Sequence, residues 1–339
     1  MEVLFKTKVM FQRRTVSRAL FFLLSSLAAL ALLFSLSGCT LELDYDKYAI
    51  VFGISDYPGA INDLNYTDDD ARDFTDLLIA QGYQVILRIT DNPIADPLVP
   101  PNIDEASYDQ LARDFTYVAQ NADLNDLFLF YFSGHGYQDP ASSGTTENTF
   151  DSDMYDEALV LVDDTLNSVV YLRDDELAVL LRTIPCARKV AIIDACNSGG
   201  FIGNQLEVDA VPPSLLEGSS ESYFEQIADA INLYSSYGDI TSDISPSDAL
   251  VIAASGEQEY SYEAPPPIEN LYYHGVMTYF LLQSVTGGDY NRDGYVTVTE
   301  TYHYIARNIN SEWNRPQSIF VNFFPHVSGG PIDYILFTK

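Results

Sequence analysis

The sequence has little cysteine and little positive charge. Only 3 of its 339 residues are Cys, which excludes a small scaffold held together by several disulfides. Lys and Arg number 17 against 49 Asp and Glu, which gives a formal net charge of −32 at pH 7. A surface of this sign repels phosphate backbones, so we expect no nucleic-acid partner. The same charge suits cationic substrates and calcium.

Apolar residues, in contrast, are plentiful. They make up 47% of the chain, with 24 Tyr and 19 Phe. This content excludes a disordered acidic tail. The length is enough to build one large domain or two ordinary ones.

The first 38 residues have the pattern of an export signal. A basic stretch at 6–18 precedes an apolar run at 19–34. That run has the length of a signal-peptide core and is short for a membrane-spanning helix.

The segment Leu36-Ser37-Gly38-Cys39 follows this run and resembles the lipobox of bacterial lipoproteins. The resemblance implies cleavage before Cys39 and a lipid on this residue. We therefore expect a signal peptide (1–38), a tether (39–46) and a protein exported to the bacterial cell envelope, where its lipid anchors it to the membrane. A plain signal peptide and an uncleaved anchor are the alternatives.

Two cysteines remain beyond Cys39, and we expect both to be free thiols. Cys186 and Cys196 are separated by residues 188–194, a run that predicts a buried strand. An extended strand rises about 3.3 Å per residue, so the two Cys would lie far beyond the reach of a disulfide.

Short apolar runs alternate with helical patterns over residues 47–339. We expect strands at 48–54, 83–89, 126–133, 188–195, 249–254 and 332–337, a hairpin at 158–162 and 168–172, and helices at 68–81, 104–121, 173–183, 273–286 and 299–312. Such an order predicts an α/β domain with a mainly parallel central sheet flanked by helices. Residues 138–156 have the composition of a loose loop. Residues 201–247 have that of a long acidic insertion, with a helix near 222–234.

Two short motifs follow expected strands of this sheet. Ser133-Gly134-His135-Gly136 ends one strand, and Asp194-Ala195-Cys196 ends another. Ligand chemistry in such sheets gathers beyond the carboxyl ends of the strands. A catalytic thiol needs a nearby imidazole and backbone N–H groups aimed at a developing oxyanion. His135 and Cys196, 61 residues apart, would meet only if their strands are neighbours.

Each motif has an ordinary explanation when it is taken alone. A Cys after a buried strand is often a small core residue, and a His between glycines can belong to a turn. The two motifs together, at corresponding strand ends, favour a catalytic pair.

Both motifs resemble the His and Cys signatures of the caspase-like cysteine peptidases, and more closely those of bacterial metacaspases. The resemblance includes 47–54, 69–71 and 253–255, and it covers most of 47–337. It implies one peptidase domain, 47–339, with a caspase-like layered fold around a mainly parallel, six-stranded sheet.

The resemblance also implies the roles of individual residues. Cys196 matches the nucleophile, and His135 matches the general base or the imidazolium partner of a thiolate. The backbone N–H groups of Gly136 and Cys196 match the oxyanion hole.

The resemblance further implies an acidic S1 pocket, which binds the residue before the cleaved bond (P1). Asp194 matches its floor, and Asp70 and Ser133 match its wall. Carboxylates in a partly dry pocket favour Arg or Lys at P1. Caspases that select Asp use basic residues instead, and the nearest candidates, Arg72 and Arg88, do not match. A structural role for Asp194, capping the turn after its strand, stays open.

Two local features qualify this comparison. Asn197 stands where metacaspases often have His, and we expect it to alter only the rim of the pocket. No Lys or Arg occurs between Lys189 and Arg292. A peptidase specific for basic residues could not cut itself there, so we expect a single chain without processing in that linker.

A twelve-residue segment near the C-terminus matches the calcium loop of EF-hands, with Gly at position 6 and an apolar residue at position 8. The expected ligands are Asp289, Asn291, Asp293, the carbonyl of Tyr295, Thr297 and Glu300. Calcium would fix the packing of two late helices, as a structural or activating ion. An acidic turn that merely resembles such a loop is the alternative. Metacaspases have a separate activating calcium site, for which Asp163 and Asp164 are candidates.

We therefore expect a monomeric cysteine endopeptidase, anchored to the membrane by lipid, that cleaves proteins or peptides after Arg or Lys. A catalytically silent, calcium-stabilised surface lipoprotein that uses the fold as a binding module is one alternative. A haemoglobinase-type peptidase with another P1 preference is a second. We expect His274, His303, His326 and Trp313 to have structural roles only.

Overall fold

A computed structural model describes most of the chain after residue 44. The described residues are 45–59, 62–90, 106–140, 155–163, 167–196, 244, 248–255, 260–263, 274–315, 323–328 and 333–339. The expected signal peptide, Cys39 and nearly all of 201–247, with the helix expected near 222–234, lie outside them. None of the described helices is both long enough and apolar enough to cross a membrane.

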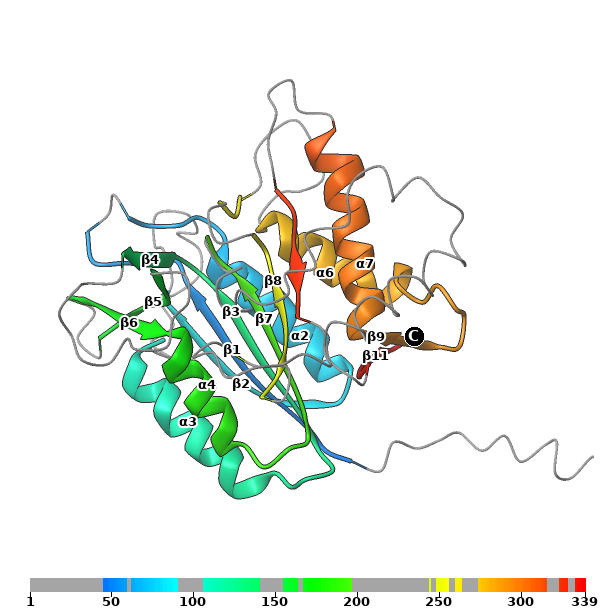
Figure 1. The fold of residues 1–339 in the computed structure, drawn as a ribbon, viewed down its shortest axis with the longest axis horizontal. Helices are drawn as coiled ribbons and strands as arrows, with labels where there is room; N and C mark the ends of the chain where they lie inside the picture. Colours follow the sequence, from blue (N-terminus) through cyan, green and yellow to red (C-terminus); the bar gives the residue numbers. More distant parts are fainter. Residues whose placement is uncertain are drawn as a thin grey trace, which may run out of the picture. The chain divides into compact units, whose positions relative to one another are not determined.

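A six-stranded sheet forms the centre of the fold (Figure 1). Its strand order is β10-β8-β7-β3-β1-β2, and every neighbouring pair is parallel except β10 with β8. The strands are β1 (Lys47–Ile54), β2 (Tyr83–Thr90), β3 (Leu127–Ser133), β7 (Arg188–Asp194), β8 (Leu250–Ala253) and β10 (His326–Val327). The predicted α/β fold with a mainly parallel six-stranded sheet is confirmed.

Helices cover both faces of this sheet, as Figure 1 shows. One face carries α2 (Thr67–Ala80), α6 (Val276–Gly287) and α7 (Val298–Asn308), and the other carries α3 (Tyr108–Asn121) and α4 (Asp174–Thr183). Successive side chains of a strand point to opposite faces, so Val51 packs with the first group and Ile50 with the second. Every residue of β1 and β3 is buried, which explains their uninterrupted apolar runs.

Individual residues determine where two of the helices end or begin. Gly82, directly after α2, has a φ of +83°, which residues with a side chain rarely adopt. It therefore ends the helix where the sequence predicts. At the start of α3, the hydroxyl of Ser107 accepts a hydrogen bond from the backbone N–H of Gln110.

The prediction of a loose loop at 138–156 is wrong at both ends of this segment. Gly136–Pro140 forms β4 and Tyr155–Val162 forms β5, and these pair antiparallel with each other. Val169–Arg173 forms β6, which completes a three-stranded sheet with β5 and confirms the predicted hairpin. Cross-strand pairing organises β4 although its sequence has no apolar run.

The predicted C-terminal strand is present but pairs outside the central sheet. It forms β11 (Ile335–Thr338), which pairs with β9 (Tyr295–Thr297) in a separate two-stranded sheet. The sixth strand of the central sheet is instead β10, which has two residues and therefore no detectable period.

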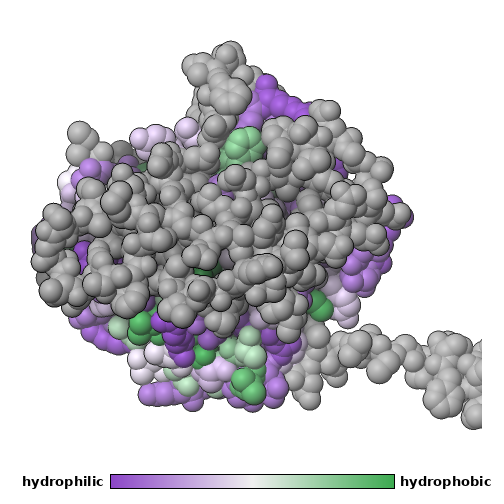
Figure 2. All heavy atoms as spheres, in the orientation of Figure 1, coloured by the Kyte–Doolittle hydropathy of each residue, from purple (hydrophilic) through white to green (hydrophobic). Residues whose placement is uncertain are grey.

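The remaining predictions about packing hold. Cys186 is buried, Cys196 is half-buried, and both thiols are free. Trp313, in a π-helical segment at Ile309–Asn314 after α7, is buried in the core. Over the described residues visible in Figure 2, hydrophilic side chains are interspersed with hydrophobic ones.

Candidate active site

The ends of β3 and β7 bring the two predicted catalytic motifs together. These strands are parallel neighbours, with Ser133 paired to Asp194 at their carboxyl ends. The backbone N–H of Gly134 donates to the carbonyl of Asp194 at 3.2 Å. His135 and Cys196 therefore follow adjacent strands at one edge of the sheet, which is the condition that their spacing in the sequence required.

Beyond this edge, Gly136 lies against Cys196. A Cβ on Gly136 would stand 1.8 Å from the carbonyl oxygen of Cys196 and 3.3 Å from the Cβ of Ala195. Only glycine allows the two segments to approach so closely. The predicted oxyanion-hole residues are thus neighbours.

The ring of His135 is held from two sides. Its Nε2 lies 2.7 Å from the backbone carbonyl oxygen of Asn62. Because a carbonyl only accepts hydrogen bonds, Nε2 carries the proton in the neutral ring and Nδ1 is left as the acceptor. The ring of Tyr57 lies 4.7 Å from that of His135, and its hydroxyl accepts from the His135 backbone N–H at 2.9 Å.

Cys196 has a half-buried thiol beside the segment 260–263. Its Sγ lies 3.9 Å from the backbone carbonyl oxygen of Ser261. Burial raises the pKa of this thiol, the backbone contact with Ser261 opposes the rise, and the charge of Asp194 adds to it. The ionised thiolate is therefore disfavoured by its surroundings.

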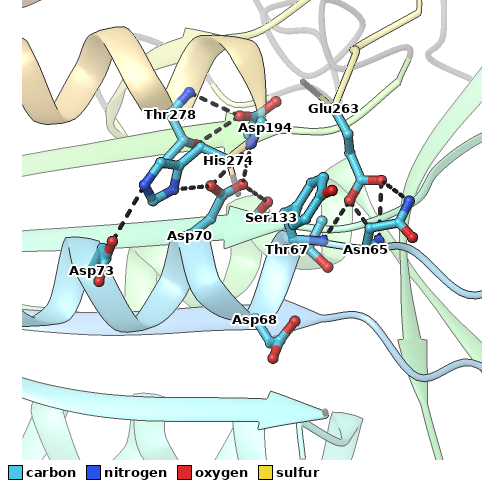
Figure 3. A network of polar contacts seen from close by, with 12 residues as sticks. Asn65, Thr67, Asp68, Asp70, Asp73, Ser133, Asp194, Glu263, His274 and Thr278 are labelled. Carbon is cyan, nitrogen blue, oxygen red and sulfur yellow. Dashed lines mark hydrogen bonds and ion pairs between the residues drawn. The ribbon is translucent and has the colours of Figure 1, made fainter. Parts of the chain in front are cut away.

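Two buried carboxylates converge on the residue that precedes α6 (Figure 3). A Cβ on Gly275 would stand 2.7 Å from an oxygen of Asp194 and 2.9 Å from an oxygen of Asp70. Asp70 lies in the first turn of α2 and Asp194 is the last residue of β7. The structure thus brings the two predicted S1 carboxylates together.

Asp70 accepts hydrogen bonds from three residues. The hydroxyl of Ser133 donates at 3.0 Å, the backbone N–H of Gly275 at 3.0 and 3.1 Å, and Nδ1 of His274 lies 3.0 Å away. Ser133, the third predicted S1 residue, therefore holds one of the two carboxylates.

Asp194 is held by the segment 260–263 and by the first turn of α6. Ser261 donates its hydroxyl at 2.6 Å. Thr278 donates its backbone N–H at 3.1 Å and its hydroxyl at 2.7 Å. These bonds fix the carboxylate inside the molecule, so Asp194 does more than cap a turn.

His274 gives this acidic pair a counter-charge. Burial alone would lower its pKa, but hydrogen bonds and charges from Asp70 and Asp73 outweigh burial and raise the pKa to about 9. Burial raises the pKa of Asp70 to about 7; His274 opposes this rise and Asp194 adds to it. Burial also raises the pKa of Asp194. Sequence reasoning did not predict this contact of His274 with the buried carboxylate of Asp70.

Sequence reasoning also missed the part played by residues 260–263. Besides Ser261, this segment contains Glu263, whose carboxylate accepts from the backbone N–H groups of Asn65 and Tyr66, both at 2.8 Å (Figure 3). These partners are nearly 200 residues apart in the chain. No local pattern in the sequence could have revealed the contact.

The two arginines nearest to the pocket in sequence are engaged elsewhere. Arg88 forms a bidentate ion pair with Asp114, with both distances 2.8 Å. Arg72 pairs with Asp68 at 3.9 Å. Among the described residues around Asp70, the basic side chain in contact with this carboxylate is that of His274.

Of the two candidate residues for an activating calcium site, the structure describes only Asp163. Asp163 accepts from the backbone N–H of Asn167 at 3.0 Å and from the hydroxyl of Ser168 at 2.6 Å, which closes the turn between β5 and β6. Asp164 and Asn197 lie outside the described residues.

The predicted calcium loop lies between two helices. Asp289 comes just after α6, Tyr295 and Thr297 belong to β9, and Glu300 is in the first turn of α7. Burial raises the pKa of Glu300, and the nearby charge of Asp293 adds to this rise.

The comparisons of this chain with known proteins agree on one family. The model of the Caspase domain matches residues 46–318. Metacaspase-1 of Candida albicans is 29% identical over 160 residues, which are 46% of this chain and 34% of that protein. Metacaspase-4 of Arabidopsis thaliana is 29% identical over 167 residues, 48% of this chain and 35% of that one.

These matches cover about a third of the length of the curated relatives. Among solved structures, Caspase-1 from Spodoptera frugiperda has a TM-score of 0.47 and 11% identity, with 87% of this chain and 91% of that chain covered.

Proposed function

Because the chain belongs to the caspase-domain family, we propose that it is a cysteine endopeptidase that cleaves peptide bonds after Arg or Lys. The observation that carries the proposal is that His135 and Cys196 follow adjacent parallel strands at one sheet edge, where Asp194 and Asp70 also lie.

In the proposed first step, Nδ1 of His135 takes the proton of the Cys196 thiol, and Sγ attacks the carbonyl carbon of the substrate. The Asn62 carbonyl keeps the other ring proton on Nε2 and stabilises the imidazolium that forms. Backbone N–H groups of Gly136 and Cys196 stabilise the tetrahedral oxyanion. His135 then returns the proton to the leaving amine, and water hydrolyses the thioester.

The neutral thiol supports base catalysis over a preformed ion pair. Burial and the charge of Asp194 both raise the pKa of Cys196, so the thiolate is costly before substrate binds. A positive P1 side chain that enters beside Asp194 would offset that charge. We therefore infer that a basic substrate helps to activate the thiol that attacks it.

The charges of the pocket support a basic P1 residue. A protonated His274 supplies one positive charge against the carboxylates of Asp70, Asp73 and Asp194, so negative charge remains uncompensated when these are ionised. A guanidinium or ammonium group supplies the missing charge, and a guanidinium can also bind a carboxylate in a bidentate manner.

The export signal extends the proposal to the cell envelope. The pattern of 1–38 and the Leu-Ser-Gly-Cys motif support a chain anchored through lipid on Cys39, acting as a monomer on proteins or peptides. Metabolic labelling with a fatty acid tests this, since Cys39→Ala should abolish the label.

The test of the activity uses fluorogenic peptides that differ only at P1. Wild type should hydrolyse Arg and Lys peptides and leave Asp and Asn peptides intact, while Cys196→Ala and His135→Ala should be inactive but folded. Activity that survives in Cys196→Ala would refute the assignment. A preference for Asn at P1 would favour a haemoglobinase-type peptidase. A thiol-directed probe that fails to label Cys196 would favour a silent binding module.

A further inference from the structure

The segment 289–300 is enclosed by two helices in the manner of a metal-binding loop. α6 ends at Gly287, two residues before the first loop position, and α7 begins at Val298, the tenth position. Positions seven to nine form β9, which pairs with β11. Val296, at the eighth position, is fully buried in the core between these elements.

In the first half of this loop, backbone N–H groups donate hydrogen bonds to side-chain oxygens of the same loop. The backbone N–H of Asp293 donates to Oδ1 of Asp289 at 3.1 Å and to Oδ1 of Asn291 at 2.9 Å. The N–H of Tyr295 donates to Oδ1 of Asp293 at 2.8 Å. Gly294, at the sixth position, has a φ of +88°, so the sharp turn there requires glycine.

Glu300 supplies a separate observation that points to a cation. Its side chain, at the twelfth position, is only 3% exposed. Oε2 accepts from the backbone N–H of Thr297 at 3.0 Å, whereas the buried Oε1 has no hydrogen-bond partner. A buried carboxylate oxygen without a partner is costly, and a bound cation would remove that cost.

The loop has the mixed oxygen donors that calcium prefers. In the part of the chain that the structure describes, no three His, Cys, Asp or Glu side chains converge as metal ligands. The carboxylates of Asp289, Asp293 and Glu300 must therefore move closer to share one ion. Asn291, the Tyr295 carbonyl and Thr297 would supply the neutral oxygens of a calcium shell.

We propose that residues 289–300 bind one calcium ion, with Glu300 as the bidentate ligand that locks α7 to the end of α6. This site does not depend on the proposed peptidase activity. It is distinct from the acidic pocket, which lies at the opposite end of α6.

The same helix joins the loop to that pocket. At the N-terminal end of α6, the backbone N–H groups of Gly275 and Thr278 donate to Asp70 and Asp194. At the C-terminal end, the loop begins with Asp289. An ion bound at the C-terminal end of α6 would therefore stabilise this helix. The N–H groups at its other end hydrogen-bond to Asp70 and Asp194.

The experiment is a calcium titration of the full chain in detergent, after removal of divalent ions with a chelator. Calorimetry should give one site with a dissociation constant of about 1 mM or tighter. The thermal midpoint should rise with calcium concentration, because an ion that binds only the folded state stabilises it. Absence of calcium binding by the folded wild type would overturn the proposal.

Glu300→Gln and Glu312→Gln make a matched pair of variants. Both remove one negative charge from a similar side chain, but Glu312 is exposed and lies outside the loop. Glu300→Gln should weaken calcium binding at least tenfold, whereas Glu312→Gln should bind like wild type. Equal affinities in the two variants would contradict the assignment. If Glu300→Gln does not fold, Asp293→Asn, at an exposed position, should weaken binding instead.

Hydrogen exchange measures the link through α6. Calcium should slow amide exchange along the whole helix, including Thr278 at its pocket end. Slower exchange confined to 289–300 would leave the metal site in place and overturn the link to the pocket.

Discussion

The backbone of Gly136 lies against the carbonyl of Cys196, so closely that a Cβ would stand 1.8 Å from that oxygen. Gly136→Ala must therefore push the two segments apart. A displacement of about 1 Å at reacting groups lowers activity by ~100-fold, so we expect kcat/KM for an Arg peptide to fall at least that much.

Gly82→Ala is the control for this variant. Gly82 also needs glycine, because its φ is +83°, but a Cβ there meets no atom within 4 Å. It should cost about 1 kcal/mol of stability in urea unfolding and leave kcat/KM unchanged. Equal activity in the two variants would show that the contact with Cys196 is unimportant.

Thr278 should position Asp194. Its hydroxyl donates to Asp194 at 2.7 Å and accepts from the buried hydroxyl of Tyr131 at 2.6 Å. Thr278→Val leaves both partners without this bond, so the free energy of unfolding should fall by about 1–3 kcal/mol. KM for an Arg peptide should rise more than kcat falls, because the carboxylate that binds P1 is no longer held in place.

Thr278→Ser keeps the hydroxyl and removes one methyl group. It should cost about 1 kcal/mol of stability and retain the wild-type KM. Steady-state kinetics with both variants separate loss of the hydrogen bond from loss of packing, and a raised KM in Thr278→Ser would count against the positioning role.

His274 should make stability depend on pH. Its pKa rises from 6.5 to about 9 in the folded chain, where it faces Asp70 and Asp73, with Asp194 beyond Asp70. The folded state therefore binds this proton more tightly. The resulting stabilisation is complete below pH 6.5 and is lost as pH rises through about 9.

Urea unfolding at a series of pH values tests this. The free energy of unfolding should fall between pH 6.5 and 9 in wild type, and His274→Gln should reduce that slope. Asp73→Asn should have a smaller effect, because the side chain of Asp73 is 58% exposed. An unchanged slope in His274→Gln would exclude the proposed charge pairing.

The region between Lys189 and Arg292 contains no cleavage site for a peptidase specific for basic residues. Wild type should therefore stay uncut within this region during incubation. Ser220→Arg, within the insertion 201–247, should introduce a cut that gel electrophoresis detects, whereas Ser220→Gln should not. The cut should disappear when Cys196→Ala is added. Cleavage of wild type in this insertion that depends on Cys196 would disprove the basic specificity.

Most of the central sheet could be predicted, because every strand except β10 has its own sequence signal. β1 and β3 are buried on both faces, so their apolar runs are continuous. β4 and β10 could not be predicted, since β4 has no apolar run and β10 has only two residues. Their strand character comes from pairing with β5 and β8.

The candidate active site was likewise predictable only in part. Short motifs that contain glycine, at the ends of two predicted strands, identify His135 and Cys196 from local sequence alone. His274 has no such motif, and its partner Asp70 is 204 residues away in the chain. The contact between Asp70 and His274 arises because the first turn of α2 lies against the start of α6, which no local pattern contains.

The pairing of β7 with β8 has a consequence for the long insertion. Val190 pairs with Leu250 and Ile193 with Ala253, so the chain leaves and re-enters the sheet on adjacent strands. A break within 201–247 made by another protease would leave both fragments held in the same parallel ladder and in the same two cores. Such a nicked molecule should migrate as two bands under denaturing conditions and still elute as one particle in native buffer.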